Sequence, residues 1–239
     1  APENKWSGAW INACEEASVA MVDNFYIGKN KVSPKDAAIL MNKLFAWENK
    51  TFKSNANTNA TRTVQMIEKN NLSYKTTIVR NPTMEQIKNE LRAGRPVISL
   101  HYGFDLNNPE IRFLRTGSAY HMMVIKGFDE NTEKFIVQDN GNHNNHGIDF
   151  RYDYDTLFSS LHDYNHTTNK TDGPATVIFT QQYFLAKVAG KPAIYLVEDG
   201  VKKGFPNGTV LKNMGFTFSQ ARKVTAEFLD KLPTEELVY

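Results

Sequence analysis

The 239-residue sequence has little net charge, no long apolar run and a single cysteine, and each of these absences excludes a class of protein. Its 28 Lys and Arg side chains nearly balance 26 Asp and Glu side chains, which gives a formal charge of +2 at pH 7. No run of Lys or Arg marks a binding face, so no nucleic acid partner is expected. No stretch approaches the ~20 apolar residues that cross a bilayer, so no transmembrane helix is expected.

The single cysteine, Cys14, excludes an internal disulfide and a site built from several thiolates. Taken alone, a lone cysteine is more often a small buried apolar residue than a nucleophile. The 41% hydrophobic and 23% charged residues are typical of a soluble globular protein, long enough for one large domain or two modest ones. The first residues, Ala1 to Lys5, are polar and do not resemble a signal peptide. A mature or trimmed secreted chain would look the same, so secretion is not excluded.

The order of helical and strand patterns along the chain predicts an α+β fold. Apolar residues at helical spacing predict helices over 14–27, from 33 to about 45, around 64–68, from 83 to about 91 and over 154–162. Strand patterns begin after Gly94 and are expected at 96–100, 120–127, 134–138 and 175–180. Helices followed by an antiparallel sheet are typical of α+β domains.

The first predicted helix begins at Cys14. Its apolar stripe consists of Cys14, Ala17, Ser18, Met21, Val22 and Phe25. We expect Glu15, Glu16 and Asp23 to lie off this buried face. Unpaired backbone N–H groups and the helix dipole at a helix start favour a thiolate, so Cys14 is a candidate nucleophile with a lowered pKa.

A general base for this thiol has to come from a distant part of the chain. The histidines are His101, His121, His143, His146, His162 and His166. Only His101 and His121 lie in strand-like runs, and the other four are expected in solvated loops. His121 precedes an apolar run at the entry to a predicted central strand, which suits a pocket, although a satisfied core histidine is an equal alternative. His143 and His146 lack a third ligand at diagnostic spacing, so neither a metal nor a cofactor is predicted.

Asp139 is the candidate for orienting His121. If the strands at 120–127 and 134–139 pair through the predicted turn at 129–131, the midpoint at residue 130 places Asp139 beside His121. A carboxylate that accepts from an imidazole N–H fixes the orientation of the ring. Asn140 is the alternative orienting residue, but it is expected to point to the opposite face.

Four blocks of sequence resemble the bacterial papain-like cysteine peptidases related to the bacteriocin-processing (double-glycine leader) peptidases. The blocks are NACEEAS at 12–18, AGRPVI at 93–98, YHMMVIKGFD at 120–129 and VQDN at 137–140. The resemblance covers roughly residues 6–180, and four blocks in the right order make it specific. It implies a papain-like fold with N-terminal helices, a nucleophile at a helix N-terminus and an antiparallel sheet that carries His and Asp.

The same resemblance implies a reaction. Cys14 would be the nucleophile, His121 the general base and acid, and Asp139 the orienting residue. The protein would hydrolyse a peptide or isopeptide bond of a protein or peptide substrate through a thioester on Cys14.

One departure from the family concerns the oxyanion hole. Relatives usually carry a Gln upstream of the cysteine, whereas the first Gln here is Gln65. If the chain was trimmed just before Ala1, this Gln was removed. Otherwise the donor to the oxyanion has to be Asn12 or the backbone N–H of Cys14, and Asn140 is a further candidate. Two alternative functions stay open: a transglutaminase-like acyltransferase with the same triad, and a catalytically inactive surface binding protein, which the missing Gln favours.

Strand and helix signals begin again in the tail of the chain, after about residue 190. Residues 193–203 predict a small hairpin, followed by short helices near 210–214 and 219–229. We therefore expect a cysteine peptidase domain at 1–190 and a small α/β module at 191–239. This module would dock on the main domain or on a surface component, because so short a segment is small for a core of its own. Residues 192–200 and 204–216 resemble a module of bacterial surface proteins, which implies an extracellular or cell-surface setting.

Overall fold

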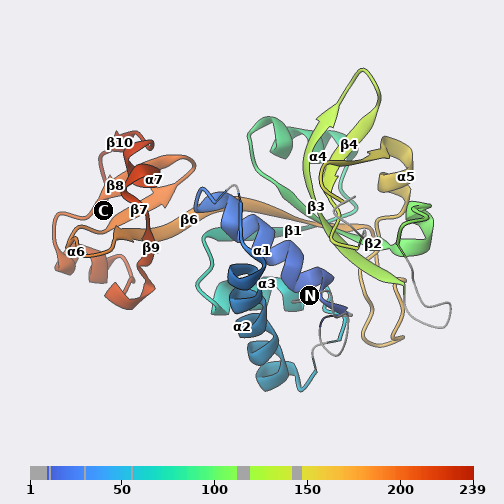
Figure 1. Ribbon diagram of the computed structural model, residues 1–239, viewed down its shortest axis with the longest axis horizontal. Helices are drawn as coiled ribbons and strands as arrows, with labels where there is room; N and C mark the ends of the chain where they lie inside the picture. The colour runs from blue at the N-terminus through green and yellow to red at the C-terminus, as the bar shows by residue number, and fades with distance from the viewer. Residues whose placement is uncertain (1–9, 11, 30, 55, 112–118, 142–146) are drawn as a thin grey trace.

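A large sheet runs through the molecule, and helices cover both of its faces (Figure 1). The computed structural model describes residues 10, 12–29, 31–54, 56–111, 119–141 and 147–239. The arrangement of helices around a mainly antiparallel sheet confirms the α+β class predicted from the sequence.

Two α-helices of the main body, the second and the fourth, begin where local capping signals predict. The α-helices described in this part of the chain are α1 (Cys14–Tyr26), α2 (Pro34–Phe52), α3 (Ala60–Lys69), α4 (Met84–Arg92) and α5 (Tyr154–Ser159). Ser33 caps α2, because its hydroxyl accepts from the backbone N–H of Asp36 at 3.1 Å. Thr83 and Gln86 form the reciprocal capping box of α4. The predicted starts of both helices are confirmed.

The helix α5 ends earlier than the pattern over 154–162 predicts. The backbone beyond it pairs with the sheet instead, because the N–H of His162 donates to Leu100 O and the carbonyl of Ser160 accepts from Tyr102 N. Backbone groups that find sheet partners no longer need helical ones.

The four strands expected in the main body are present, together with two that the sequence pattern did not reveal. The strands are β1 (Tyr74–Arg80), β2 (Val97–Tyr102), β3 (Tyr120–Asp129), β4 (Lys134–Gln138), β5 (Phe150–Asp153) and β6 (Thr176–Val188). The unpredicted strands are β1 and β5. All seven residues of β1 pair with β6, from Tyr74 opposite Gln182 to Arg80 opposite Thr176. Its conformation therefore depends on a partner about 100 residues away.

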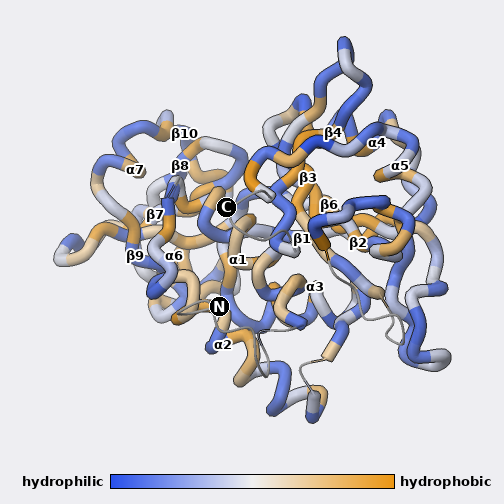
Figure 2. Tube along the Cα trace, turned by 45° about the vertical axis from the view of Figure 1, so that its right-hand side comes forward, coloured by the Kyte–Doolittle hydropathy of each residue, from blue (hydrophilic) through white to orange (hydrophobic). Residues whose placement is uncertain are grey.

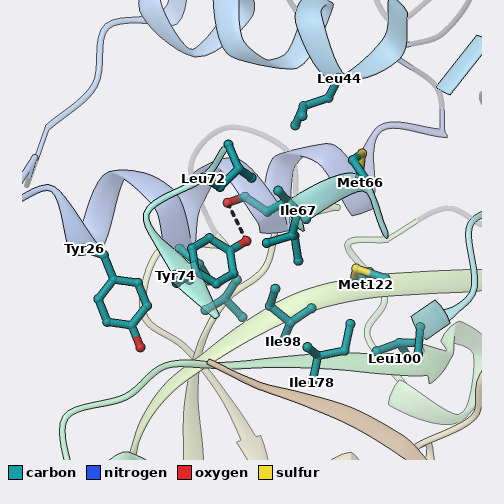
Figure 3. Packing of buried hydrophobic residues seen from close by; sticks show 14 of the residues in the cluster. Tyr26, Leu44, Met66, Ile67, Leu72, Tyr74, Ile98, Leu100, Met122 and Ile178 are labelled. Carbon is teal, nitrogen blue, oxygen red and sulfur yellow. Dashed lines mark hydrogen bonds between the residues drawn. The ribbon is translucent and has the colours of Figure 1, made fainter. Parts of the chain in front are cut away.

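The strand β3 separates two hydrophobic cores. Met122 and Val124 face α1, α2 and α3, whereas Met123 and Ile125 face α4 and α5. Because successive side chains of a strand alternate, one strand contributes to both cores. Figure 2 shows the apolar segments gathered where β2, β3 and β6 lie. The first core is drawn in Figure 3, where the hydroxyl of Tyr74 on β1 donates to a backbone carbonyl of α1.

The helix α1 is buried on more sides than its apolar stripe predicts. Glu15, Glu16 and Asp23, expected off the buried face, are at most 2% exposed, whereas Phe25 of the stripe is 53% exposed. The expectation was wrong because α1 packs against β3 on one side and against α2 and α3 on others. Polar side chains on several sides of this helix are therefore enclosed and need partners.

The tail pairs through two of its strands with the C-terminal part of β6. Its elements are β7 (Tyr195–Glu198), β8 (Val201–Gly204), α6 (Gly208–Asn213), η4 (Phe218–Gln220), β9 (Arg222–Val224), α7 (Ala226–Asp230) and β10 (Thr234–Glu235). The predicted hairpin is present as β7 and β8. Figure 1 shows these elements at one end of the molecule, joined to the rest by β6. The strand order β10-β8-β7-β6-β2-β3-β4-β5, with β1 and β9 also on β6, makes β6 common to body and tail.

The domain boundary between residues 190 and 191 stays a prediction, and truncation after Gly190 tests it. We expect the shortened chain to keep a reactive thiol, because no candidate site residue lies in the tail. We expect it to be less stable, because Phe184 and Leu185 of β6 pack against tail residues. Thiol labelling and thermal unfolding measure the two effects. Aggregation would show that the tail belongs to the core, and a folded chain without thiol reactivity would show that the tail contributes to the site.

Candidate active site

Cys14 is the first residue of α1 and lies against the start of β3. The helix begins without a side-chain cap, after Ala13. The side-chain amide of Asn140 donates to the carbonyls of both Cys14 and Met122, so the start of the helix lies next to the strand at the residue that follows His121. The sequence placed Cys14 at a helix start, and the structure adds the strand against which it lies.

The thiol hydrogen bonds to the side chain of the next residue. Sγ of Cys14 donates to Oε2 of Glu15 at 3.0 Å, and Oε1 of Glu15 accepts from the backbone N–H of Thr58 at 2.7 Å. Burial and the neighbouring carboxyl of Glu15 raise the pKa of Cys14 well above its ordinary value, although the backbone of Met122 opposes this. The expected lowering of the thiol pKa is therefore wrong for this arrangement, because the carboxyl is closer to the sulfur than a sequence reading suggested.

His121 and Asp139 form a buried hydrogen-bonded pair. Nε2 of His121 lies 2.8 Å from Oδ1 of Asp139, and the two residues are 3% and 5% exposed. The carboxylate also accepts from the hydroxyl of Tyr152 at 2.6 Å and from the backbone N–H of Gly141 at 2.9 Å. An ionised carboxylate only accepts, so Nε2 carries the hydrogen and Nδ1 holds the lone pair of the neutral ring.

The surroundings of Asp139 keep it ionised. Burial would raise the pKa of Asp139, but His121, Tyr152 and the Gly141 N–H together hold it below its ordinary value. The charge on this carboxylate raises the pKa of Tyr152 in turn, after burial as the larger cause. No pattern in the sequence pointed to Tyr152, because this residue comes from β5, a strand that was not predicted.

The register that brings Asp139 to His121 differs from the predicted one. The turn is later than expected, since Asp129 pairs with Lys134, and an irregularity between Ile125 and Gly127 shifts the ladder. On the far side of this irregularity, Val124 pairs with Gln138. The same register places Asp139 opposite residue 123, two positions from His121. Both side chains are still on one face, because positions two apart on a strand share a face, and the carboxylate reaches His121 diagonally.

Asn140 points to the opposite face, as the sequence predicts, and ties the helix to the strand. Its Nδ2 lies 3.0 Å from three acceptors, which are Cys14 O, Ser18 Oγ and Met122 O. These contacts engage both of its N–H hydrogens, which favours a structural tie over an oxyanion donor. The other candidate, Asn12, is exposed two residues before Cys14.

His101 is a satisfied core histidine. It is fully buried opposite His121 in the β2–β3 ladder, with Nδ1 2.8 Å from Ser160 Oγ and Nε2 2.7 Å from Ser99 Oγ. Burial, and then the nearby His121, lower the pKa of His101 to about 3. A ring that stays neutral with both nitrogens bound to hydroxyls is a poor base for the thiol, so His121 is the better candidate.

The remaining histidines lie away from this pair or outside the described residues. His162 is half-buried, and its Nδ1 contacts the carbonyl of Gly173. His143 and His146 lie outside the described residues. Within the described ranges, no three or more His, Cys, Asp or Glu side chains are grouped as metal ligands. Across the same ranges, every helix is too short or too polar to cross a membrane.

Comparison with known proteins gives one family. A search of curated proteins finds no match. One solved structure from Bacillus anthracis, described as a C39-like peptidase, superposes with a TM-score of 0.44 at 15% identity, over 70% of this chain and 88% of that one. The sequence profile of the Peptidase C39-like family matches residues 1–172. This match spans Cys14, His121 and Asp139 and more than half of the sequence, and the chain therefore belongs to the Peptidase C39-like family.

Proposed function

We propose that the protein is a papain-like cysteine peptidase that hydrolyses a peptide or isopeptide bond of a protein or peptide substrate through a thioester on Cys14. The observation that carries the proposal is the buried His121–Asp139 hydrogen bond of 2.8 Å, and the residue after His121, Met122, is joined to Cys14 through the Asn140 amide. A base that a carboxylate orients and a nucleophile at a helix start are groups that thiol acyl transfer requires, and the proposed reaction brings His121 within reach of the sulfur.

In the proposed reaction His121 accepts the Cys14 proton, and the thiolate attacks the substrate carbonyl. His121 then donates that proton to the leaving amine, and water hydrolyses the thioester. Asp139 orients the ring and stabilises its charged form. The first N–H groups of a helix lack partners within the helix, so the Cys14 N–H, with Asn12 as a second candidate, would bind the oxyanion.

One observation favours an alternative function. The hydrogen bond to Glu15 and the raised pKa of Cys14 keep the thiol protonated, as suits an inactive binding protein on the same scaffold. The transglutaminase-like alternative shares the triad with the peptidase and differs only in the acceptor, an amine in place of water. For any of the three, we also propose an extracellular or cell-surface setting, on the resemblance of the tail to modules of surface proteins.

Labelling of Cys14 tests the proposed function. A peptidyl electrophile that targets cysteine peptidases is expected to form one adduct, at Cys14, and to stop the cleavage of a mixture of peptides of varied sequence. Mass spectrometry locates the adduct and identifies the cleavage products. The variant Cys14→Ser is expected to show neither adduct nor cleavage. Cleavage that survives in Cys14→Ser would contradict the proposal, transfer to an added amine would favour the acyltransferase, and no cleavage by the folded wild type would favour the binding protein.

A further inference from the structure

Glu15 is held against the Cys14 sulfur by contacts at both of its carboxyl oxygens. Oε2 accepts from Sγ at 3.0 Å, and Oε1 accepts from Thr58 N at 2.7 Å. The loop that carries Thr58 is fixed in turn, because its carbonyl accepts from the hydroxyl of Tyr120 on β3 at 2.9 Å. Since Glu15 is 2% exposed, water does not compete effectively for this contact.

The other charged groups around Glu15 come from four elements. Glu16 of α1 and Glu48 of α2 are both buried, and Arg62 of α3 acts on Glu48. Burial raises the pKa of Glu16 and of Glu48, and both carboxyls interact electrostatically with Glu15. On β3, the hydroxyl of Tyr120 stays neutral, because burial raises its pKa well above the ordinary value. Among these described groups, Glu15 is the one whose carboxyl contacts the sulfur.

We propose that Cys14 and Glu15 share one proton in the resting protein, which stays on the sulfur in the major form and lies on the Glu15 carboxyl in a minor form that supplies the thiolate. The proton moves from Sγ to Oε2: the S–H bond breaks, an O–H bond forms, and the pair keeps a net charge of −1. The neutral carboxyl then donates a hydrogen bond to the thiolate. This inference rests on the proposed function, because it concerns the same thiol, and it adds a group that touches the reacting sulfur.

The shared proton predicts how the thiolate population depends on pH. Two forms carry one proton, the thiol beside a carboxylate and the thiolate beside a carboxylic acid, and their ratio does not change with pH. Their joint population rises as the pair loses its first proton, near the pKa of about 7 to which burial raises Glu15. The second proton leaves only well above the ordinary pKa of a thiol, because the ionised Glu15 and burial hold it there. The thiolate therefore forms in two steps with a plateau between them.

The experiment follows alkylation of Cys14 by iodoacetamide as a function of pH. The wild type is expected to show an inflection near pH 7 and a second one at high pH. Glu15→Gln cannot take the proton and carries no charge, so it is expected to lose the lower inflection and to shift the upper one to lower pH. His121→Ala and the matched control Glu16→Gln are expected to keep the lower inflection, since neither residue accepts the thiol proton in the resting protein.

Three outcomes would overturn the inference: a single inflection in the wild type, a lower inflection that persists in Glu15→Gln, or one that disappears in His121→Ala. If Glu15→Gln fails to fold, the alkylation curve of the wild type still decides, because a single inflection overturns the inference. The alkylation uses no substrate, so the two proposals fail separately. Peptide cleavage with a lower inflection unmoved by Glu15→Gln would reject the shared proton alone. Two-step alkylation without any cleavage would reject the peptidase alone.

Discussion

Replacing His121 by alanine is expected to lower the rate of peptide cleavage by a factor of about 10²–10⁴, the usual contribution of a general acid–base group. The amine of a peptide bond is a poor leaving group unless it is protonated, and His121 is a described histidine whose ring a buried carboxylate orients. Product formation from a peptide mixture, quantified by mass spectrometry, measures the effect.

The chain is expected to stay folded after this change. Asp139 keeps two of its hydrogen bonds, from the Tyr152 hydroxyl and the Gly141 N–H, so the buried carboxylate is not left alone. The core packing of β3 comes from its apolar neighbours, Met122 to Ile125. Circular dichroism checks the fold, and the matched control is His162→Ala, which removes a half-buried histidine outside the pair. An unchanged rate in folded His121→Ala would remove His121 from the proposed mechanism.

The variant Asp139→Asn separates orientation from acid–base chemistry. An amide can donate as well as accept, so it no longer fixes the hydrogen on Nε2 of His121. We expect a loss of the same order as for His121→Ala, and little further loss when the two changes are combined, because the residues act as a unit. Additive losses in the double variant would show that Asp139 acts independently of His121.

Replacing Arg222 by alanine is expected to lower the free energy of unfolding by about 3 kcal/mol, the scale for breaking a buried ion pair from one side. Asp23 on α1 is fully buried, and both guanidinium Nη atoms of Arg222 contact its carboxylate, one of them at 2.8 Å. Without Arg222, the carboxylate would keep only the Ser73 N–H and hydroxyl, each at 2.8 Å. An uncompensated buried charge is costly, and the loss corresponds to a fall in Tm of roughly 6–12 °C for a chain of this size.

Thermal and urea unfolding measure the effect of Arg222→Ala. The matched control is Lys223→Ala, the exposed neighbour on β9, which is expected to leave Tm unchanged. Neutralising the partner as well, in the double variant Asp23→Asn with Arg222→Ala, is expected to recover part of the loss, because no unpaired charge remains buried. A loss below about 0.5 kcal/mol in Arg222→Ala would show that the tail does not depend on this contact, as is usual for surface ion pairs.

Local signals in the sequence were sufficient for the starts of α2 and α4 and for the presence, but not the register, of the β3–β4 hairpin. A capping side chain and its partner lie within three or four residues, so their geometry depends little on the rest of the chain. The same holds for the β7–β8 hairpin, whose strands are joined by a short turn. The strand β1 was not predicted, because its partner, β6, is about 100 residues distant in sequence. No local pattern identifies a partner at that distance.

For the candidate site, the sequence predicts which residues take part, and only the folded chain shows what surrounds them. The residue types and their order placed Cys14 at a helix start, and His121 and Asp139 on adjacent strands. The shifted register, the Tyr152 hydrogen bond and the burial of Glu15 against the thiol came only from packing. A glutamate in the first turn of a helix looks exposed until other elements enclose that helix. The enclosure of α1 depends on β3, α2 and α3, and on Arg222 from the tail, so the environment of the nucleophile could be learned only from the folded chain.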